Sequence, residues 1–378
     1  MTAPLKVMTI LGTRPEIIRL SRVMALLDQH VKHVLVHTGQ NSDFELNEVF
    51  FRDLALRAPD HYLGVNRASL GTILGEVMMK SETVLAAERP DAVLILGDTN
   101  SAFAAIMARR MRIPVYHMEA GNRCFDFNVP EEINRRLIDH VSDFNLAYTE
   151  HARRNLLAEG IHPRRIYLTG SPMREVLDAN RPGIEASDVV ERLGLQPGKF
   201  FVASMHRAEN VDVAAHFDQL LDALRRLAAT YDLPVVVSTH PRTKQRLEAR
   251  SGAVDPRVQF LPPFGYHDYV KLQLAARCTL SDSGTISEES SILGFPAVTM
   301  RTAMERPEAM DSGHIILAGR EPETILNAVA LAVHNHDLDR RQPIAEEYQV
   351  TNASSRVVKL ILGTALLGRQ WDGIVQAA

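Results

Sequence analysis

Residues 6–16 read KVMTILGTRPE, an apolar run followed directly by a turn and a proline. The run 6–11 places apolar residues on both of its alternating faces, which is typical of a strand buried on both sides in a parallel sheet. Pro15 suits the first turn of a helix, because the N–H that it lacks would have no partner there. The stretch therefore predicts the first strand, turn and helix of a doubly wound α/β fold.

The first half of the chain repeats this pattern. Further strands are predicted at 33–38, 92–96, 115–118, 144–147 and 166–168, with helices at 15–29, 70–88 and 101–110. Repeated β-α-β units form a parallel sheet with helices on both faces. We therefore expect a Rossmann-like domain over residues 1–175.

A second series follows the polar stretch 178–197. Strands are predicted at 200–204, 233–238, 258–260, 278–281 and 297–300, and helices at 214–231, 265–276 and 285–294. We expect a second Rossmann-like domain over 176–354, with the closing segment 355–378 returning to the first domain as a helix. Ligands of such sheets bind outside the carboxyl ends of the strands, so we expect the active site in a central cleft between the domains.

Composition narrows the functional classes. The 378 residues are 46% hydrophobic and 23% charged, which excludes a long disordered or collagen-like chain. A formal net charge of -4 without a long basic run disfavours a nucleic-acid binder. The two cysteines, Cys124 and Cys278, are too few for a disulfide framework, and no apolar run approaches the length of a membrane span. We therefore expect a cytoplasmic protein with no membrane and no nucleic-acid partner.

Arg14 is the first candidate site residue. Gly12 permits a tight turn after the first predicted strand, and N–H groups at the start of the helix could face an anion. This turn would deliver Arg14 to the carboxyl edge of the sheet. The alternative is a plain strand-to-helix turn with a surface arginine. Without the other glycines of G-x-G-x-x-G, the turn is a poor dinucleotide fingerprint.

Three carboxylates are predicted at the same sheet edge. Asp98 follows the strand 92–96, Glu119 follows the next strand, and Glu131 begins the next helix. Like-charge repulsion would raise the pKa of at least one of them, which favours a neutral acid beside an ionised base for proton transfer at carbon. Asp98 could instead be a plain helix N-cap, and a Mg²⁺ site is the competing explanation for the cluster. Three arginines are available to offset the charge: Arg14, Arg123 and Arg135.

Two strand ends of the second half each offer an imidazole beside a cation. His206 precedes Arg207, and His240 is followed by Pro241 and Arg242. A lone histidine is more often structural, so the repetition of the position is the argument for function.

The stretch 281–289, SDSGTISEE, predicts a strand, a Ser-Gly turn and a helix. The amides of Ser283, Gly284 and Thr285 could hold a diphosphate at the start of that helix. Glu289, one turn further, could accept both hydroxyls of a ribose or lie on a solvated helix face. Two arginines after the next strand could clamp phosphate or sugar oxygens, namely Arg301 and Arg306.

These motifs resemble the non-hydrolysing UDP-N-acetylglucosamine 2-epimerase family over essentially the whole chain. The family's signatures occur in order as Gly12-Thr13-Arg14-Pro15-Glu16, Gly97-Asp98-Thr99, Glu119-Ala120-Gly121, Pro130-Glu131-Glu132-Ile133-Asn134-Arg135, His206-Arg207, Asp282-Ser283-Gly284 and Glu305-Arg306-Pro307-Glu308. The resemblance implies two Rossmann-like domains in the glycosyltransferase-B (GT-B) arrangement, a homodimer, and UDP held mainly by the second domain.

The resemblance also implies a reaction. Asp98, Glu119 and Glu131 would be the acid/base carboxylates, with Arg14 and His206 beside the diphosphate and the sugar. The C2 proton is removed and UDP leaves anti to give a 2-acetamidoglycal, which is protonated on its other face before UDP adds again to C1. No metal and no NAD are required. The predicted substrate- and UDP-binding residues are Arg19, Arg135, Arg207, His240, Phe264, Ser283, Gly284, Thr285, Glu289, Arg301 and Arg306.

Three positions depart from the family pattern. Arg19 replaces a usual lysine, Thr285 replaces the second glycine of Ser-Gly-Gly, and Gln40-Asn41 replaces the Gln-His of an allosteric UDP-sugar site. The chain resembles the branch that epimerises capsule and O-antigen precursors, such as UDP-2,3-diacetamido-2,3-dideoxy-glucuronate or 6-deoxy-UDP-N-acetylhexosamines. Arg19 could bind a uronate carboxylate or merely conserve a positive charge. We expect UDP-N-acetylglucosamine to be a poor substrate and not to be needed as an activator.

Two other functions share parts of this pattern. A GT-B glycosyltransferase would have the same fold and UDP site, but it would need an acceptor groove and has less use for Asp98, Glu119 and Glu131. A non-catalytic UDP-sugar sensor would bind without turnover, which the presence of all three carboxylates disfavours. Turnover of a UDP-sugar without an acceptor separates the epimerase from both.

Overall fold

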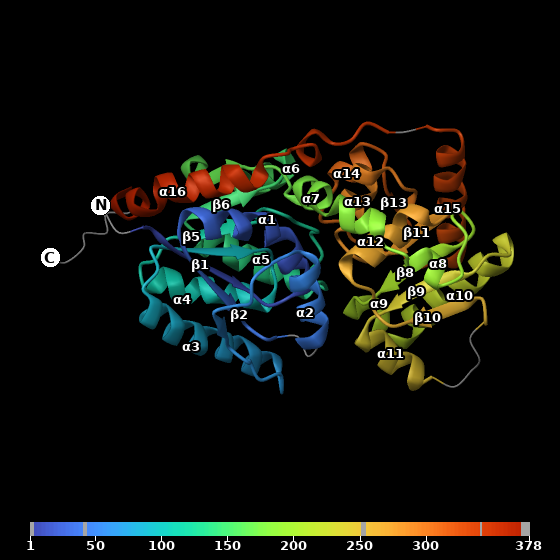
Figure 1. Ribbon diagram of the computed structural model, residues 1–378, viewed down its shortest axis with the longest axis horizontal. Helices are drawn as coiled ribbons and strands as arrows, with labels where there is room; N and C mark the ends of the chain where they lie inside the picture. Colours follow the sequence, from blue (N-terminus) through green and yellow to red (C-terminus); the bar gives the residue numbers. More distant parts are fainter. Residues whose placement is uncertain (1–3, 41–43, 251–254, 341, 372–378) are drawn as a thin grey trace. The chain divides into compact units, whose positions relative to one another are not determined.

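The computed structural model describes residues 4–40, 44–250, 255–340 and 342–371. The chain forms two compact units (Figure 1). Unit 1 comprises Met1–Ala179 together with Gln349–Ala378, and unit 2 comprises Asn180–Tyr348. Each unit contains one parallel sheet, of seven strands in unit 1 and six in unit 2. The predicted fold class, with two Rossmann-like doubly wound units, is confirmed.

The strands of unit 1 lie in the order β3-β2-β1-β4-β5-β6-β7. In chain order they are β1 (Lys6–Leu11), β2 (Lys32–His37), β3 (His61–Tyr62), β4 (Ala92–Leu96), β5 (Val115–Met118), β6 (Phe144–Ala147) and β7 (Ile166–Leu168). The chain builds outward from β1 to β3 and then returns to β4 on the other side of β1. This reversal of strand order places a ligand-binding switch point at the carboxyl ends of β1 and β4.

The helices of unit 1 connect these strands and cover the sheet. They are α1 (Arg14–His30), α2 (Phe44–Asp53), α3 (Leu70–Glu88), η1 (Asn100–Phe103), α4 (Ala104–Arg110), α5 (Pro130–Val141), α6 (Glu150–Ala158), η2 (Pro163–Arg165), α7 (Met173–Ala186, which runs on into unit 2) and α16 (Ala353–Trp371). The single helix predicted at 101–110 is a 3-10 turn, η1, followed by α4. The short strand β3 and the helices α2 and α6 were not predicted.

The central strands have the composition that their position requires. All five residues of β4 are buried, and in β1 only Lys6 is not. Met8, Ile10, Val93 and Ile95 share one apolar core with side chains of α3. Burial on both faces explains why these strands are continuous apolar runs, since each face is covered by helices.

The last helix, α16, packs against α1 in unit 1, as the red and blue helices of Figure 1 show. The Tyr116 hydroxyl of β5 lies 2.7 Å from Thr364 Oγ1 on α16. At the start of α16, the Ser354 amide donates to Glu175 at 2.9 Å. The chain therefore returns to unit 1 after the last residue of unit 2, and α16 completes the core of unit 1.

Unit 2 has the strand order β10-β9-β8-β11-β12-β13. Its strands are β8 (Phe201–Met205), β9 (Val235–Thr239), β10 (Val258–Leu261), β11 (Cys278–Ser281), β12 (Ala297–Thr299) and β13 (Ile316–Leu317). Its helices are α8 (Val189–Arg192), α9 (Ala208–Val211), α10 (Ala214–Tyr231), α11 (Pro241–Glu248), α12 (Tyr266–Ala275), α13 (Ile286–Leu293), α14 (Glu308–Asp311), α15 (Pro322–Asp337) and η3 (Glu346–Tyr348). Here the switch point lies between β8 and β11. Within the ranges that the structure covers, no helix is long and apolar enough to cross a membrane.

The docking of α16 gives a stability prediction. Ile361 is completely buried, whereas its neighbour Leu362 is 47% exposed. Ile361→Ala should lower the free energy of unfolding by about 2–5 kcal/mol, because it leaves a cavity in the core of unit 1. Leu362→Ala should change it by about 0.5 kcal/mol or less. Urea unfolding of both variants measures the difference, and equal losses would show that α16 does not dock through Ile361.

Candidate active site

Three turns at one edge of the unit 1 sheet carry predicted site residues. Arg14 is the first residue of α1, Asp98 follows β4, and Glu119 follows β5. Because β1, β4 and β5 are consecutive neighbours in the sheet, their carboxyl ends lie side by side. Gly12 has no room for a side chain in this arrangement, since a Cβ would collide with the Thr38 hydroxyl.

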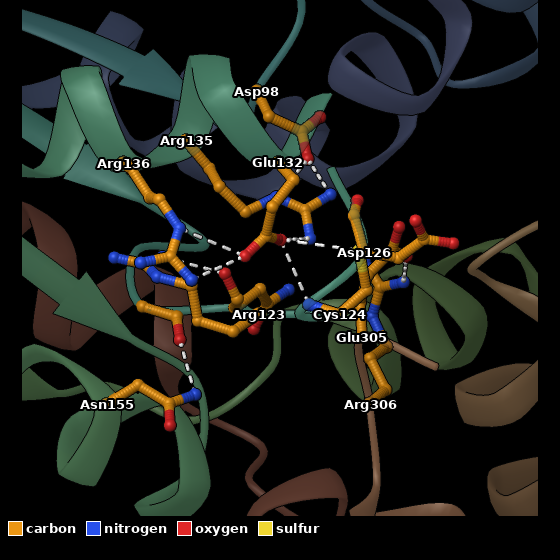
Figure 2. Close-up of polar contacts among 12 residues, drawn as sticks. Asp98, Arg123, Cys124, Asp126, Glu132, Arg135, Arg136, Asn155, Glu305 and Arg306 are labelled. Atoms are coloured by element: carbon orange, nitrogen blue, oxygen red, sulfur yellow. Dashed lines mark hydrogen bonds and ion pairs between the residues drawn. The ribbon is translucent and has the colours of Figure 1, made fainter. Parts of the chain in front are cut away.

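Asp98 is held by two side chains of α5. Arg135 donates from Nε and Nη2 to Asp98 Oδ2, at 3.0 and 2.6 Å, and the Asn134 amide group donates to the Asp98 carbonyl oxygen at 2.9 Å. Figure 2 shows the Arg135 guanidinium between Asp98 and Glu132, to which it donates at 3.2 Å. The Asp98 side chain is 23% exposed, whereas that of Arg135 is 4% exposed. Arg135 therefore offsets the charge of Asp98 from the buried side and leaves part of the carboxylate accessible.

Glu119 is paired in a similar way with Arg19 of α1. Arg19 Nη1 donates to Glu119 Oε2 at 2.8 Å, and the Arg19 side chain is 1% exposed. Glu119 has a φ of 64°, a left-handed conformation that costs energy in a residue with a side chain. Two roles were considered for Arg19, binding a uronate carboxylate or conserving a positive charge. Its guanidinium is buried against Glu119, so the argument for a uronate substrate does not hold.

Glu131 and Glu132, both in the first turn of α5, differ in environment. Glu131 is partly exposed, whereas Glu132 is completely buried. Glu132 accepts hydrogen bonds from the Cys124 amide at 3.0 Å and from Arg136 Nη2 at 2.8 Å. Burial would raise the pKa of Glu132, but these hydrogen bonds hold it below its ordinary value. Glu132 was not predicted to have a role, although Arg135 and Arg136 follow it at the three- and four-residue spacing of helical ion pairs.

The buried carboxyl of Glu16 contacts two of the site turns. It accepts hydrogen bonds from the Gly12 amide at 3.0 Å, from Thr13 Oγ1 at 2.8 Å and from Thr99 Oγ1 at 3.1 Å. Burial raises the pKa of Glu16 from 4.5 to about 7, against the opposing effect of the three hydrogen bonds. The Thr-x-x-Glu spacing of a helix capping box could have drawn attention to Glu16.

Arginine contacts bear on the two interpretations of the acidic cluster. Asp98 and Glu119 each contact an arginine at 2.8 Å or less. Within the part of the chain that the structure describes, no group of three or more His, Cys, Asp or Glu side chains is arranged to hold a metal ion. The observed arrangement is therefore one of carboxylate–guanidinium pairs.

In unit 2, His206 is oriented by Asp282. His206 follows β8, Asp282 follows the neighbouring strand β11, and His206 Nδ1 lies 2.9 Å from Asp282 Oδ1. Asp282 Oδ2 also accepts from the amides of His206 and Arg207 at 3.0 Å each, and from Asn210 Nδ2 at 3.1 Å. Burial would raise the pKa of Asp282, but the adjacent His206 and these donors hold it well below its ordinary value. Because a carboxylate only accepts, the Nδ1 of His206 carries a proton and Nε2 is the nitrogen that can face a ligand.

His240 lies next to His206. Their ring centroids are 5.8 Å apart. His240 Nδ1 accepts a hydrogen bond from the Arg242 amide at 3.2 Å and so caps α11, the helix that it precedes. The two strand ends that were predicted to offer imidazoles thus bring them together.

The Ser-Gly turn after β11 differs from the expected amide cradle. The Ser283 amide donates to Ser281 Oγ at 3.0 Å, and the Thr285 amide donates to Ser283 Oγ at 3.3 Å. Two of the three predicted amides therefore have partners within the turn. The hydroxyls of Ser283 and Thr285, which lie 3.0 Å apart, remain half-buried polar groups at the start of α13.

Arg301 and Arg306 are both held by acidic residues of unit 2. Arg301 donates through two nitrogens to the two oxygens of Glu305, at 2.7 and 2.8 Å. Arg306 donates to the Gly284 carbonyl oxygen at 2.9 Å and lies 3.4 Å from a Glu288 oxygen. A Cβ at Gly284 would displace the Arg306 guanidinium from its place against the Gly284 carbonyl oxygen. Arg301 therefore supports Glu305 in the interior, and Arg306 fixes the Ser-Gly turn.

The remaining predicted residues of unit 2 are also placed. Glu289 is 5% exposed and accepts from Gln273 Nε2 at 2.9 Å. Phe264 is half-buried against the apolar core beside α12. Arg207 Nη2 lies 3.8 Å from Glu305. These residues surround the carboxyl ends of the unit 2 strands from several elements.

Comparison with known proteins identifies the family. Residues 25–362 match the UDP-N-acetylglucosamine 2-epimerase family model. The chain therefore belongs to the UDP-N-acetylglucosamine 2-epimerase family.

Three relatives illustrate the similarity. The chain is 47% identical to the UDP-N-acetylglucosamine 2-epimerase of Rickettsia bellii, with a TM-score of 0.91 and coverage of 97% of this chain and 98% of that one. It is 33% identical to the Methanocaldococcus jannaschii UDP-GlcNAc 2-epimerase crystallised with UDP-GlcNAc and UDP, with a TM-score of 0.88 and coverage of 95% and 100%. It is also 33% identical to the UDP-2,3-diacetamido-2,3-dideoxy-D-glucuronate 2-epimerase of Pseudomonas aeruginosa, over 94% of this chain and 99% of that one.

The contacts of Asp282 give a pH-dependent prediction. Because its folded-state pKa lies below the ordinary value of 3.8, Asp282 stabilises the fold above about pH 4, and this contribution is lost as the pH falls towards the folded-state pKa. Asp282→Asn should lower the free energy of unfolding by about 2–4 kcal/mol at pH 7. The difference from the natural chain should shrink at pH 3. Urea unfolding at both pH values measures it, and an equal difference at both would mean that charge is not the cause.

Proposed function

We propose that this protein epimerises UDP-N-acetylglucosamine at C2 of the sugar. Family membership supports this reaction. The observation that carries it to this chain is the pair Asp98 and Glu119, two arginine-bound carboxylates that follow neighbouring parallel strands. Proton removal from carbon and proton return to carbon require acid and base groups held in position. The relative crystallised with UDP-GlcNAc supports the choice of substrate.

In the proposed reaction, a carboxylate among Asp98, Glu119 and Glu131 takes the C2 proton while the bond from C1 to the UDP oxygen breaks on the opposite face. The electron pair of the C2–H bond forms the C1–C2 double bond of a 2-acetamidoglycal. UDP leaves with the electrons of the C1–O bond. A second carboxyl then protonates C2 on the other face as the UDP oxygen attacks C1, which restores every bond with C2 inverted. No oxidant or reductant enters this sequence.

We assign Arg14 and His206 to the diphosphate. A guanidinium and an imidazole N–H stabilise the charge that develops on UDP as it leaves. Arg19 and Arg135 act through the carboxylates that they hold. The proposed UDP-binding residues of unit 2 are Arg207, His240, Phe264, Ser283, Gly284, Thr285, Glu289 and Arg306, whereas Arg301 acts through Glu305.

The substrate class follows from the same contacts. A preference for a modified sugar was expected from Arg19, but its buried pairing with Glu119 removes that argument. We therefore propose that UDP-N-acetylglucosamine itself is accepted, and that a 2,3-diacetamido-glucuronate, the substrate named for one relative, is the alternative to test. The expectation drawn from Gln40-Asn41 stays a prediction, because Asn41 lies outside the described residues.

Epimerisation in deuterated water tests this function directly. UDP-N-acetylglucosamine incubated with the protein and no acceptor should yield the C2 epimer with deuterium at C2, together with small amounts of free UDP and glycal. NMR follows all four species, and UDP-2,3-diacetamido-2,3-dideoxy-glucuronate is run in parallel. Epimer that keeps its original C2 hydrogen would exclude the elimination route. A higher kcat/KM for the glucuronate would move the protein to the other substrate class.

The acid/base assignment predicts the effect of three isosteric variants. Asp98→Asn, Glu119→Gln and Glu131→Gln should each lower kcat by about two to four orders of magnitude, because each removes a proton acceptor. UDP affinity, measured by calorimetry, should change little. Glu82→Gln, which alters an exposed carboxylate of α3, is the matched control and should keep full activity. Near-native rates in all three would place the chemistry elsewhere.

We also propose that the protein is a cytoplasmic homodimer. The two cysteines are free thiols, which suits a reducing compartment. Two large apolar side chains of α3 face solvent, since Leu70 is 62% exposed and Met79 is 61% exposed. The two residues lie nine positions apart, on opposite sides of the helix, so the homodimer is proposed from the family resemblance, and Met79 is a position on α3 at which it can be tested.

The dimer proposal can be tested with a charge placed on α3. Light scattering coupled to size exclusion should give a dimer for the natural chain, and Met79→Arg should shift it towards monomer because a charge would be buried in the interface. Leu331→Arg, on a 52% exposed leucine of α15, is the matched control and should leave the mass unchanged. A monomeric natural chain would contradict the proposal.

A further inference from the structure

Glu16 is a buried carboxylate that the proposed reaction does not use. It is 1% exposed and lies in the first turn of α1. Its Oε2 accepts from the Gly12 amide and the Thr13 hydroxyl, and its Oε1 accepts from the Thr99 hydroxyl at 3.1 Å. The Gly12 amide donates to Glu16, and the two threonine hydroxyls complete its contacts, so both oxygens of the buried carboxyl group have a partner.

Helix capping explains part of this arrangement. A glutamate in the first turn that binds back to the residues before the helix satisfies N–H groups that have no helical partner. The contacts of Glu16 with Gly12 and Thr13 are of this kind. The bond from Thr99 is not, because Thr99 lies 83 residues further along the chain, in the turn after β4.

The contact with Thr99 connects two turns that carry reacting groups. Thr13 immediately precedes Arg14, and Thr99 immediately follows Asp98. Asp98 is also held through its side chain and its carbonyl oxygen, by Arg135 and Asn134. Glu16, in the first turn of α1, adds a contact to this turn through Thr99.

We propose that Glu16 is a positioning residue for the epimerisation, one whose carboxylate sets the distance between the Arg14 turn and the Asp98 turn. The proposal rests on the function proposed above. The base acts at C2 and UDP leaves from C1 of the same sugar. The relative position of the two turns must therefore be fixed to within a fraction of an ångström. Misplacement of about 1 Å costs about a hundredfold in rate.

Four variants separate positioning from capping. Glu16→Gln keeps the shape but points an N–H₂ group at hydroxyl or amide donors. Thr99→Ala removes the bond between the turns on the Glu16 side and also the acceptor of the Ser101 amide at the start of η1, 3.3 Å away, and Thr99→Ser restores the hydroxyl for both contacts. Thr13→Ala weakens the cap of α1, while the Gly12 amide and Thr99 still hold Glu16.

The kinetic result expected is a fall in kcat without a matching change in KM. Glu16→Gln and Thr99→Ala should lower kcat by about ten- to a hundredfold, with KM within about threefold of the natural chain. Thr99→Ser and Thr13→Ala should keep kcat within about threefold. If Thr13→Ala and Thr99→Ala lose the same small amount of activity, Glu16 is only a helix cap and the proposal is wrong.

Amide hydrogen exchange gives a readout that does not depend on catalysis. In Glu16→Gln, peptides covering residues 8–16 and 94–103 should both exchange faster, because both turns lose a shared partner. Faster exchange confined to 8–16 would overturn the proposal. If the natural chain fails to epimerise UDP-N-acetylglucosamine, the proposed function fails, and the exchange experiment still decides whether Glu16 couples the two turns. If Glu16→Gln does not fold, exchange over residues 8–16 in Thr99→Ala decides, since that variant leaves the cap of α1 intact and unchanged exchange there would overturn the proposal.

Discussion

The parallel pairing of β1 with β4 is the constraint on which the candidate site depends. Val7, Met8 and Thr9 pair in register with Ala92, Val93 and Leu94. Because the strands run in the same direction, the turns that follow them emerge together at one edge of the sheet. The Gly12–Glu16 turn and the Gly97–Thr99 turn become neighbours although more than eighty residues separate them. The contact between Glu16 and Thr99 follows from this register.

Several acidic side chains of unit 1 are linked by arginines into a network of ion pairs. Arg135 joins Asp98 to Glu132, Arg136 joins Glu132 to Glu159 at 2.9 Å, and Arg123 reaches both Glu159 and Asp139. Buried ion pairs add little net stability, because desolvation of the charges opposes their attraction, but they are costly to break. Such a network holds the carboxylates of a site in one geometry, although it adds little to the stability of the fold. In unit 2, a buried carboxylate also fixes a neighbouring side chain, since Asp282 after β11 orients His206 after β8.

Family membership and local geometry contribute different parts of the functional conclusion. The family accounts for the reaction and for the kind of substrate, while the geometry accounts for what individual residues do. Arg19 illustrates the difference. As a departure from the family pattern it suggested a uronate substrate, but its contact with Glu119 shows an arginine that serves a neighbouring carboxylate. Arg301 is similar, since a residue expected to clamp a ligand is engaged by Glu305.

The amino-acid sequence by itself determined the two Rossmann-like series and the strand ends that carry Arg14, Asp98, Glu119, His206 and Ser283, because apolar runs and turn residues are local signals. It did not predict the short edge strands β3 and β13, which have too few residues to show a pattern. It also gave Glu16, Glu132 and Asp282 no individual role, although each stands in a family signature, because the contacts that define these roles include partners from other turns and strands. Only the tertiary structure decided which carboxylate meets which arginine and which amides of the Ser-Gly turn have partners. Hydrogen bonds and ion pairs depend on distances of a few ångströms between strands and helices, and the linear order of residues does not contain those distances.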